Sequence, residues 1–215
     1  KKAFELIVLE DNSLNAFAAP GGIIGVNAGL FKYSDNEAQF ASVISHELAH
    51  LSQRHFARQI LEGSDRSNQS LATVLASIVV AVATSSPAAV IGGQGILASQ
   101  QLRFSRLYET EADREGYVTL QKAGYDTVEM SEMFKNMQEV RRLSGDNMPE
   151  FLLTHPITTR RITESRERAR EYPSPGKKDS LNFRLIKKRV QYLMTDNLSI
   201  RAMEKEIGSN DEDIY

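Results

Sequence analysis

The sequence contains no cysteine in its 215 residues. Disulfide bonds and thiolate metal ligands are therefore excluded, and any metal site must be built from histidines and carboxylates. A cysteine-free chain fits either the cytosol or a bacterial periplasm and does not distinguish between them. An excess of charge of one sign is also missing, since the net charge is −2 and the pI is about 6.2. This balance gives no reason to expect a nucleic-acid partner.

Long hydrophobic runs are absent as well. The most apolar stretch, from Ser70 to Ala83, is too short to cross a bilayer before Pro87 interrupts it. We therefore expect no transmembrane span in the chain, and we interpret this stretch as a buried or membrane-surface helix. No signal peptide is present, and the abrupt start on a strand-like segment is compatible with removal of upstream sequence. Hydrophobic content of 41% and charged content of 25% are ordinary for a folded domain.

Three short β-prone segments open the chain, at residues 4–9, 14–19 and 23–26. Turn residues separate them, and short strands joined by tight turns predict an antiparallel meander. A capping box at Ser34 then predicts a helix from Asp35 to about Leu61, and helical patterns dominate the rest of the chain. The predicted fold class is α+β, mainly α-helical, with a small antiparallel sheet.

The segment from His46 to His50 reads H-E-L-A-H and lies within the predicted helix. Residues four apart on an α-helix share a face, so both histidines can direct a ring nitrogen at one Zn²⁺ ion. Glu47 lies beside them and can take the proton of a metal-activated water. The motif is short enough to arise by chance, and the alternative is an exposed amphipathic helix with two solvated histidines.

A catalytic zinc site needs a third protein ligand and one open position. His55 is five residues after His50 and therefore points well away from the zinc face. The longer all-histidine motif is excluded, because Gln53 and Phe56 stand where it requires Gly and His. A carboxylate from another helix is the remaining choice for the third ligand.

Glu109 and Asp113 lie one helical turn apart on one face. The first can bind zinc, and the second can accept a hydrogen bond from the outer nitrogen of a ligand histidine. Glu111 is rotated about 160° from that face, so it is the weaker candidate. Taken alone, the pair is better explained by a solvated acidic face opposite Arg106 and Arg114.

Three motifs occur in a characteristic order, namely H-E-L-A-H, S-R-x-x-E-x-x-A-D from residue 105 and H-P-x-T-x-x-R from residue 155. Together they resemble peptidase family M48, and within it the BepA-like and HtpX-like zinc metalloproteases of gluzincin type. The resemblance covers residues 14–161 and implies one Zn²⁺ per chain. It implies the following roles: His46, His50 and Glu109 as metal ligands, Glu47 as general base, Asp113 as the partner of a ligand histidine, and His155 and Arg161 as further catalytic residues.

The resemblance implies a zinc-dependent endopeptidase that hydrolyses protein or unfolded polypeptide substrates in envelope protein quality control. The flanking transmembrane helices of some family members are missing, so the chain looks like the soluble branch. We therefore expect a location in the bacterial periplasm, with a membrane-peripheral position as a further option and membrane-protein assembly machinery as a partner. No nucleic-acid partner is expected. The alternative is a latent, zinc-stabilised chaperone or assembly factor with little proteolytic turnover.

His155 is the one histidine that the predicted zinc helix does not explain, and two roles are open for it. It could donate a hydrogen bond to the reacting carbonyl oxygen, or its nitrogen could occupy the fourth metal position and hold the enzyme latent. The sequence also predicts a lid at residues 86–100, because this stretch is rich in glycine and small side chains. Pro173 and Pro175 mark a linker at residues 173–179. It separates a metallopeptidase domain (1–172) from a C-terminal helical extension (180–215).

Overall fold

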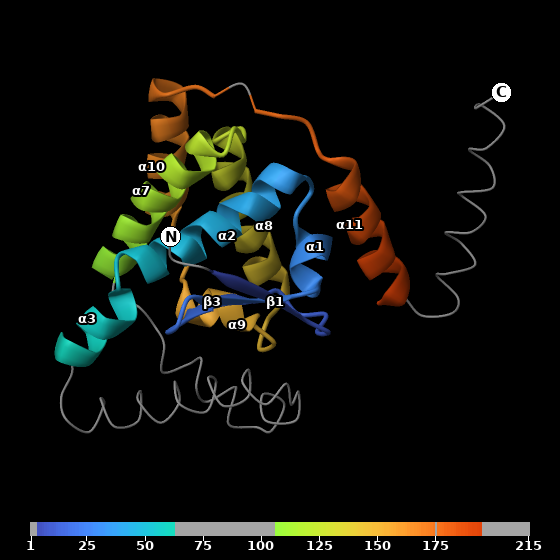
Figure 1. Ribbon diagram of the computed structural model, residues 1–215, viewed down its shortest axis with the longest axis horizontal. Helices are drawn as coiled ribbons and strands as arrows, with labels where there is room; N and C mark the ends of the chain where they lie inside the picture. Colours follow the sequence, from blue (N-terminus) through green and yellow to red (C-terminus); the bar gives the residue numbers. More distant parts are fainter. Residues whose placement is uncertain (1–3, 63–105, 175, 195–215) are drawn as a thin grey trace, which may run out of the picture.

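The computed structural model describes residues 4–62, 106–174 and 176–194 (Figure 1). The expected apolar helix at 70–83 and the expected lid at 86–100 lie outside these ranges. In the described part of the chain, no helix has the length and apolar character needed to cross a membrane. The predicted class is confirmed, because a small sheet is accompanied by many helices. The division of the chain into domains and a linker stays a prediction.

The sheet contains β1 (Glu5–Leu9), β2 (Ala16–Ala19) and β3 (Ile23–Asn27) in the order β1-β3-β2. The predicted antiparallel meander is wrong for β1, which pairs in parallel with β3, whereas β2 pairs with β3 antiparallel. Burial explains this order: β3 is buried along its whole length and takes the centre, while β1 exposes alternate apolar residues and takes an edge. Gly25 leaves room for the Phe17 ring of β2, because a Cβ atom there would lie 2.2 Å from the ring and the ring would have to move.

The central helix is α2 (Glu37–Ser52), which contacts β2 and β3 as well as α7 (Arg106–Lys122) and α8 (Val128–Leu143) (Figure 1). Its N-cap is Asn36, whose side chain accepts a hydrogen bond from the Gln39 amide, so the helix begins two residues later than predicted. Gly116 allows α7 to pack closely against α2, since a Cβ atom there would lie 3.1 Å from the His46 backbone nitrogen. This contact brings the acidic face of α7 next to the histidines of α2.

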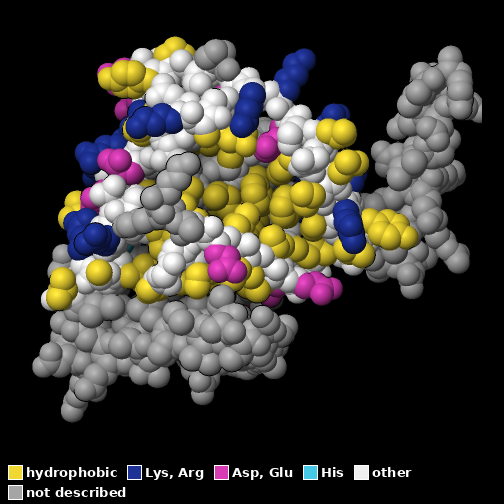
Figure 2. All heavy atoms as spheres, viewed as in Figure 1, with side chains coloured by type: hydrophobic (Ala, Val, Ile, Leu, Met, Phe, Trp, Pro, Cys, Tyr) yellow, Lys and Arg dark blue, Asp and Glu magenta, His cyan; other side chains and the backbone are white. Residues whose placement is uncertain are grey.

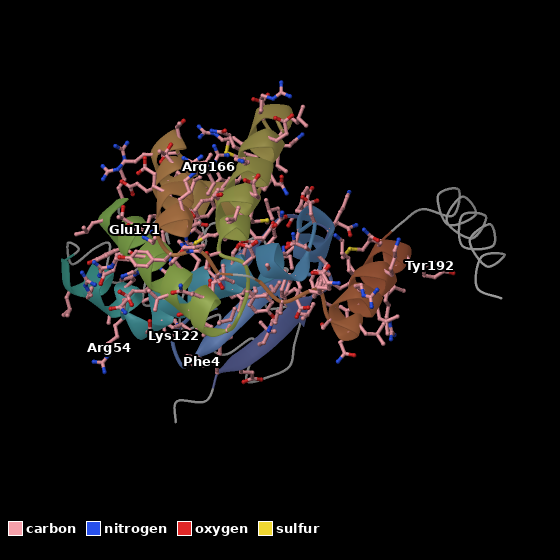
Figure 3. The ribbon with its side chains drawn as sticks, turned by 90° about the horizontal axis from the view of Figure 1, so that it is seen from above. Phe4, Arg54, Lys122, Arg166, Glu171 and Tyr192 are labelled. Atoms are coloured by element: carbon pink, nitrogen blue, oxygen red, sulfur yellow. The ribbon has the colours of Figure 1, made fainter. Side chains whose placement is uncertain are left out.

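The helix predicted from Asp35 to Leu61 is broken in two. α2 ends at Ser52, and α3 (His55–Glu62) begins after a turn in which Arg54 has a φ of 53°. A left-handed residue is the usual way to terminate a helix, although glycine or asparagine normally occupies it. The side chain of Arg54 points outward at this junction in Figure 3, so the strain of the turn is confined to the backbone and the Cβ atom. The break redirects α3 and with it His55.

The C-terminal part of the described chain packs back onto this core. α9 (Glu150–Thr154) and α10 (Thr159–Glu171) follow α8, and α11 (Leu181–Leu193) packs on α1 (Gly29–Tyr33). The Asp179 carboxylate accepts from the first amide of α2, and Phe183 packs against Phe31 and Phe40. The remaining apolar residues of α11 are largely exposed. Figure 2 also shows hydrophobic side chains across the centre of the face of the molecule that is turned to the viewer. Residues 179–183 are therefore fastened to the N-terminus of the central helix.

Candidate metal centre

Four buried side chains from three parts of the fold point at one position, namely His46, His50, Glu109 and His155. One ligand atom from each lies within 4.8 Å of the others. The first two come from α2 and the third from α7, while His155 directly follows α9. The predicted ligands are thus brought together, and His155, for which two roles were open, joins them.

The spacing of these atoms suits a tetrahedral ion. A metal with bonds of about 2.0–2.1 Å to its ligands separates those ligands by roughly 3.3 Å. The Nε2 atom of His46 lies 3.0 Å from Nε2 of His50 and 3.4 Å from Nδ1 of His155. An oxygen of Glu109 lies 2.8 Å from His155 Nδ1 and 3.3 Å from His50 Nε2. Nitrogen and carboxylate donors at this spacing fit zinc.

Electrostatics favour a cation at this position. Burial lowers the pKa of His46, but the nearby carboxylates of Glu109 and Asp113 outweigh it and raise that pKa to about 9. Burial dominates at His50 and holds its pKa well below the usual value. Burial raises the pKa of Glu109, but its interactions with His155 and with the Arg161 guanidinium hold that pKa well below its usual range. Glu109 is therefore ionised, and it supplies negative charge where an ion would bind.

Asp113 lies beside the outer ring nitrogen of His46. Its Oδ1 lies 3.0 Å from Nδ1 of His46, the ring nitrogen that faces away from the four-residue group. A carboxylate there fixes the imidazole tautomer, because the outer nitrogen must carry a proton to donate to it. The lone pair on the inner nitrogen of His46 is then left for a metal.

Arg161 contacts the acidic side chains of α7. It donates from Nε and Nη2 to the two oxygens of Asp113, at 2.7 Å each, and Nη1 lies 2.8 Å from Oε2 of Glu109. Nη1 also donates to the Pro156 carbonyl, one residue after His155. The side chain is buried, and its guanidinium lies over the Phe134 ring. Arg161 therefore ties both carboxylates to the segment that carries His155.

Glu47 follows His46 on α2 and is completely buried. One of its carboxylate oxygens lies 3.5 Å from Nε2 of His155, while Nδ1 of the same ring faces the ligand group. Burial raises the pKa of Glu47, which makes the carboxylate a stronger base. The structure thus places Glu47 beside the ligand group, outside the set of four residues whose ligand atoms converge.

His55 lies outside the group of converging ligand atoms, but its ring contacts the outer nitrogen of His50. Its Nδ1 lies 2.9 Å from Nδ1 of His50, because the turn at Arg54 folds α3 back toward α2. Glu111, the weaker ligand candidate from the sequence, lies outside the ligand group and contacts His55 and Arg58 instead. Sequence reasoning missed this arrangement because it assumed one continuous helix, and neither proline nor glycine marks the break.

Comparison with known proteins agrees with this geometry. The model of peptidase family M48 matches residues 1–169. The beta-barrel assembly-enhancing protease of Escherichia coli K12 is 34% identical over 88% of this chain and 39% of its own length. A provisionally named beta-barrel assembly-enhancing protease of Vibrio cholerae is 37% identical over 88% of the chain and 40% of its own length. The mitochondrial metalloendopeptidase OMA1 of Arabidopsis thaliana is 31% identical over 74% of the chain and 30% of its own length.

These bacterial relatives are matched over about two fifths of their length. The family match, in contrast, covers well over half of the present chain and includes every residue of the candidate metal centre. The chain belongs to peptidase family M48.

Proposed function

We propose that this chain is a zinc-dependent endopeptidase, with His46, His50 and Glu109 as the zinc ligands. The observation that carries the proposal is the convergence of these buried donor atoms, with the carboxylate of Glu47 beside them. Each chain would hold one zinc ion. Zinc bound there would polarise a scissile carbonyl and lower the pKa of a water ligand towards ~7.

Glu47 supplies the general base. Its buried carboxylate has a raised pKa and lies close enough to the ligand group to accept a proton from an attacking water. The same carboxyl group then returns the proton to the amine that leaves. Asp113 and Arg161 hold His46 and Glu109 in position during these transfers, through the contacts of 3.0 Å and 2.8 Å described above.

His155 determines whether the site is active at rest. Its Nδ1 lies within the ligand group, so in this conformation it takes the fourth position that a catalytic site keeps open. We propose that His155 acts as a latch, which must move before a substrate carbonyl can approach. The competing role, donation to the reacting carbonyl oxygen, requires His155 to remain beside the site after it leaves the ligand group.

The substrates are proposed to be proteins or unfolded polypeptides, in quality control of the bacterial envelope. The names of the bacterial relatives, which refer to assembly of beta-barrels, support a periplasmic or membrane-peripheral location and a partner in membrane-protein assembly. A second candidate function is a latent, zinc-stabilised chaperone. The closed set of four donors favours it, because structural zinc sites have four protein ligands.

The replacement Glu47→Gln separates these functions. It keeps the volume of the side chain but removes the base, so proteolysis should fall by about 10²–10⁴-fold while zinc content stays at one ion per chain. Hydrolysis of an unfolded protein by the wild type and by the variant, with zinc measured on both, is the test. If both hydrolyse the substrate equally, the endopeptidase assignment fails, and substantial zinc loss in the variant would show that Glu47 is a ligand.

A further inference from the structure

The ring of His50 is in contact through both of its nitrogens. Nε2 faces the ligand group, and Nδ1 lies 2.9 Å from Nδ1 of His55. His55 is completely buried, and its ring stacks on Tyr108 with the ring centres 4.6 Å apart. Its other nitrogen, Nε2, lies 3.3 Å from an oxygen of Glu111, which also accepts a hydrogen bond from Arg58 at 2.8 Å.

The positions of the protons in this row follow from simple chemistry. A histidine that binds a metal through Nε2 carries its proton on Nδ1. Two Nδ1 atoms at 2.9 Å can share only one proton, so Nδ1 of His55 must accept the proton of His50. The proton of a neutral His55 is then on Nε2, which faces Glu111, and an ionised carboxylate can only accept. Each protonated nitrogen in the series His50, His55 and Glu111 therefore faces an acceptor.

We propose that His55 is a positioning residue for the metal centre: it fixes the tautomer and orientation of His50, and Glu111 fixes the tautomer of His55. This inference rests on the proposed function, because it concerns a site that holds zinc. A carboxylate positions His46 in the same way, since Nδ1 of His46 lies 3.0 Å from Oδ1 of Asp113. The two ligand histidines are thus supported differently, one by an anion and the other by a neutral ring.

The turn at Arg54 makes the contact between His55 and His50 possible. On a continuous helix, His55 would be rotated about 140° from His50 around the axis, and the two rings could not meet. The left-handed conformation of Arg54, with a φ of 53°, is unfavourable for a residue with a side chain, and it is the feature that brings His55 back. The unfavourable backbone conformation of Arg54 thus allows His55 to contact the proposed metal ligand His50.

Proton positions can be observed directly by NMR. In long-range ¹H–¹⁵N spectra of zinc-loaded wild-type protein, labelled at its four histidines, we expect a proton on Nδ1 of His50 and on Nε2 of His55. The Nδ1 resonance of His55 should be that of an unprotonated acceptor. A proton on Nδ1 of His55, or on both of its nitrogens, would overturn the proposal.

Three substitutions at residue 55 give an independent readout. His55→Ala should lower the zinc affinity, measured by competition with a chelator, by about 10–100-fold. His55→Asn should recover part of the loss, because its amide oxygen reaches the position of Nδ1. His55→Gln should recover less, because its amide lies near the position of Nε2. The visible spectrum of the Co²⁺-substituted proteins should follow the same order.

Phe56→Leu is the matched control, since Phe56 is the buried neighbour of His55 on α3 and has no polar side-chain atom. It should lower the unfolding temperature without changing the zinc affinity. Equal affinity in wild type and His55→Ala, or equal loss in His55→Asn and His55→Gln, would refute the positioning role alone. If the wild-type protein itself binds no zinc, the proposed function fails, and the positioning role fails with it.

Discussion

Replacement of Arg161 by methionine should strongly destabilise the metal-free protein. The substitution keeps most of the apolar stem over Phe134 but removes a guanidinium that contacts Asp113 twice and Glu109 once. All three charged side chains are at most 8% exposed, so water cannot replace the lost contacts. Removal of one partner from a buried ion pair typically costs about 3–5 kcal/mol, because the other charge is left buried and uncompensated. We expect a loss within this range.

The origin of this loss can be tested with two further variants. Asp113→Asn in the Arg161→Met background removes one of the stranded charges, and should recover about 1–3 kcal/mol of unfolding free energy. Arg161→Lys keeps the charge but cannot donate in parallel to both oxygens of Asp113, so its loss should be intermediate. Zinc should reduce the loss in every variant that retains Glu109, because the ion supplies positive charge to this carboxylate.

The measurement is denaturant unfolding followed by circular dichroism, with chelator or with zinc in excess. If Arg161→Met loses less than about 1 kcal/mol with chelator, the contacts of Arg161 are too weak for a buried ion pair. The same conclusion follows if Asp113→Asn gives no recovery in the double variant. Either result would refute the reasoning that Arg161 compensates the carboxylates of α7.

Three other predictions concern the metal centre. His155→Ala, with zinc content checked, should raise basal hydrolysis of an unfolded protein if His155 is a latch; a large decrease would identify a donor to the reacting oxygen, and no change a bystander. Because the pKa of His46 is about 9 against an ordinary 6.5, its contribution to the stability of the metal-free protein should be full below pH 6.5 and lost as the pH rises through 9. Calorimetry at pH 7.5 in buffers of different ionisation enthalpy should accordingly detect about one proton released per zinc bound, and no release would contradict this pKa. Gly116→Ala should weaken zinc binding and lower the unfolding temperature, although alanine favours helices, because its Cβ would lie 3.1–3.2 Å from the α2 backbone; a more stable variant would refute the close packing.

Helix geometry predicts which side chains of the candidate metal centre share a face. His46 and His50 share a face by their spacing, and so do Glu109 and Asp113. The structure places all four side chains at one position or directly beside it. Spacing on single helices could not show that α7 packs against α2, but the order of the three motifs indicated it through the family resemblance.

Features that depend on contacts between elements were not predictable in this way. β1 pairs in parallel with β3 because β3 is the more deeply buried strand and takes the centre of the sheet. The sequence does not show this difference in burial, because both strands are apolar. The turn at Arg54 has no glycine or proline to mark it, and the residue adopts a conformation that its type disfavours. The contact between His55 and His50 was missed as a direct consequence, because the predicted helix continues through Arg54.

The two ligand histidines of α2 differ in a way that bears on how the site holds its charge. If both outer nitrogens faced carboxylates, the buried centre would contain one further anion besides Glu47, Glu109 and Asp113, with Arg161 as the buried guanidinium that opposes them. The neutral ring of His55 supplies a hydrogen-bond acceptor to His50 without adding that charge. Glu111, which completes the row, is paired with Arg58 and is 23% exposed, so its charge is partly solvated and compensated nearby. The arrangement therefore orients two zinc ligands without adding a further buried anion to Glu47, Glu109 and Asp113.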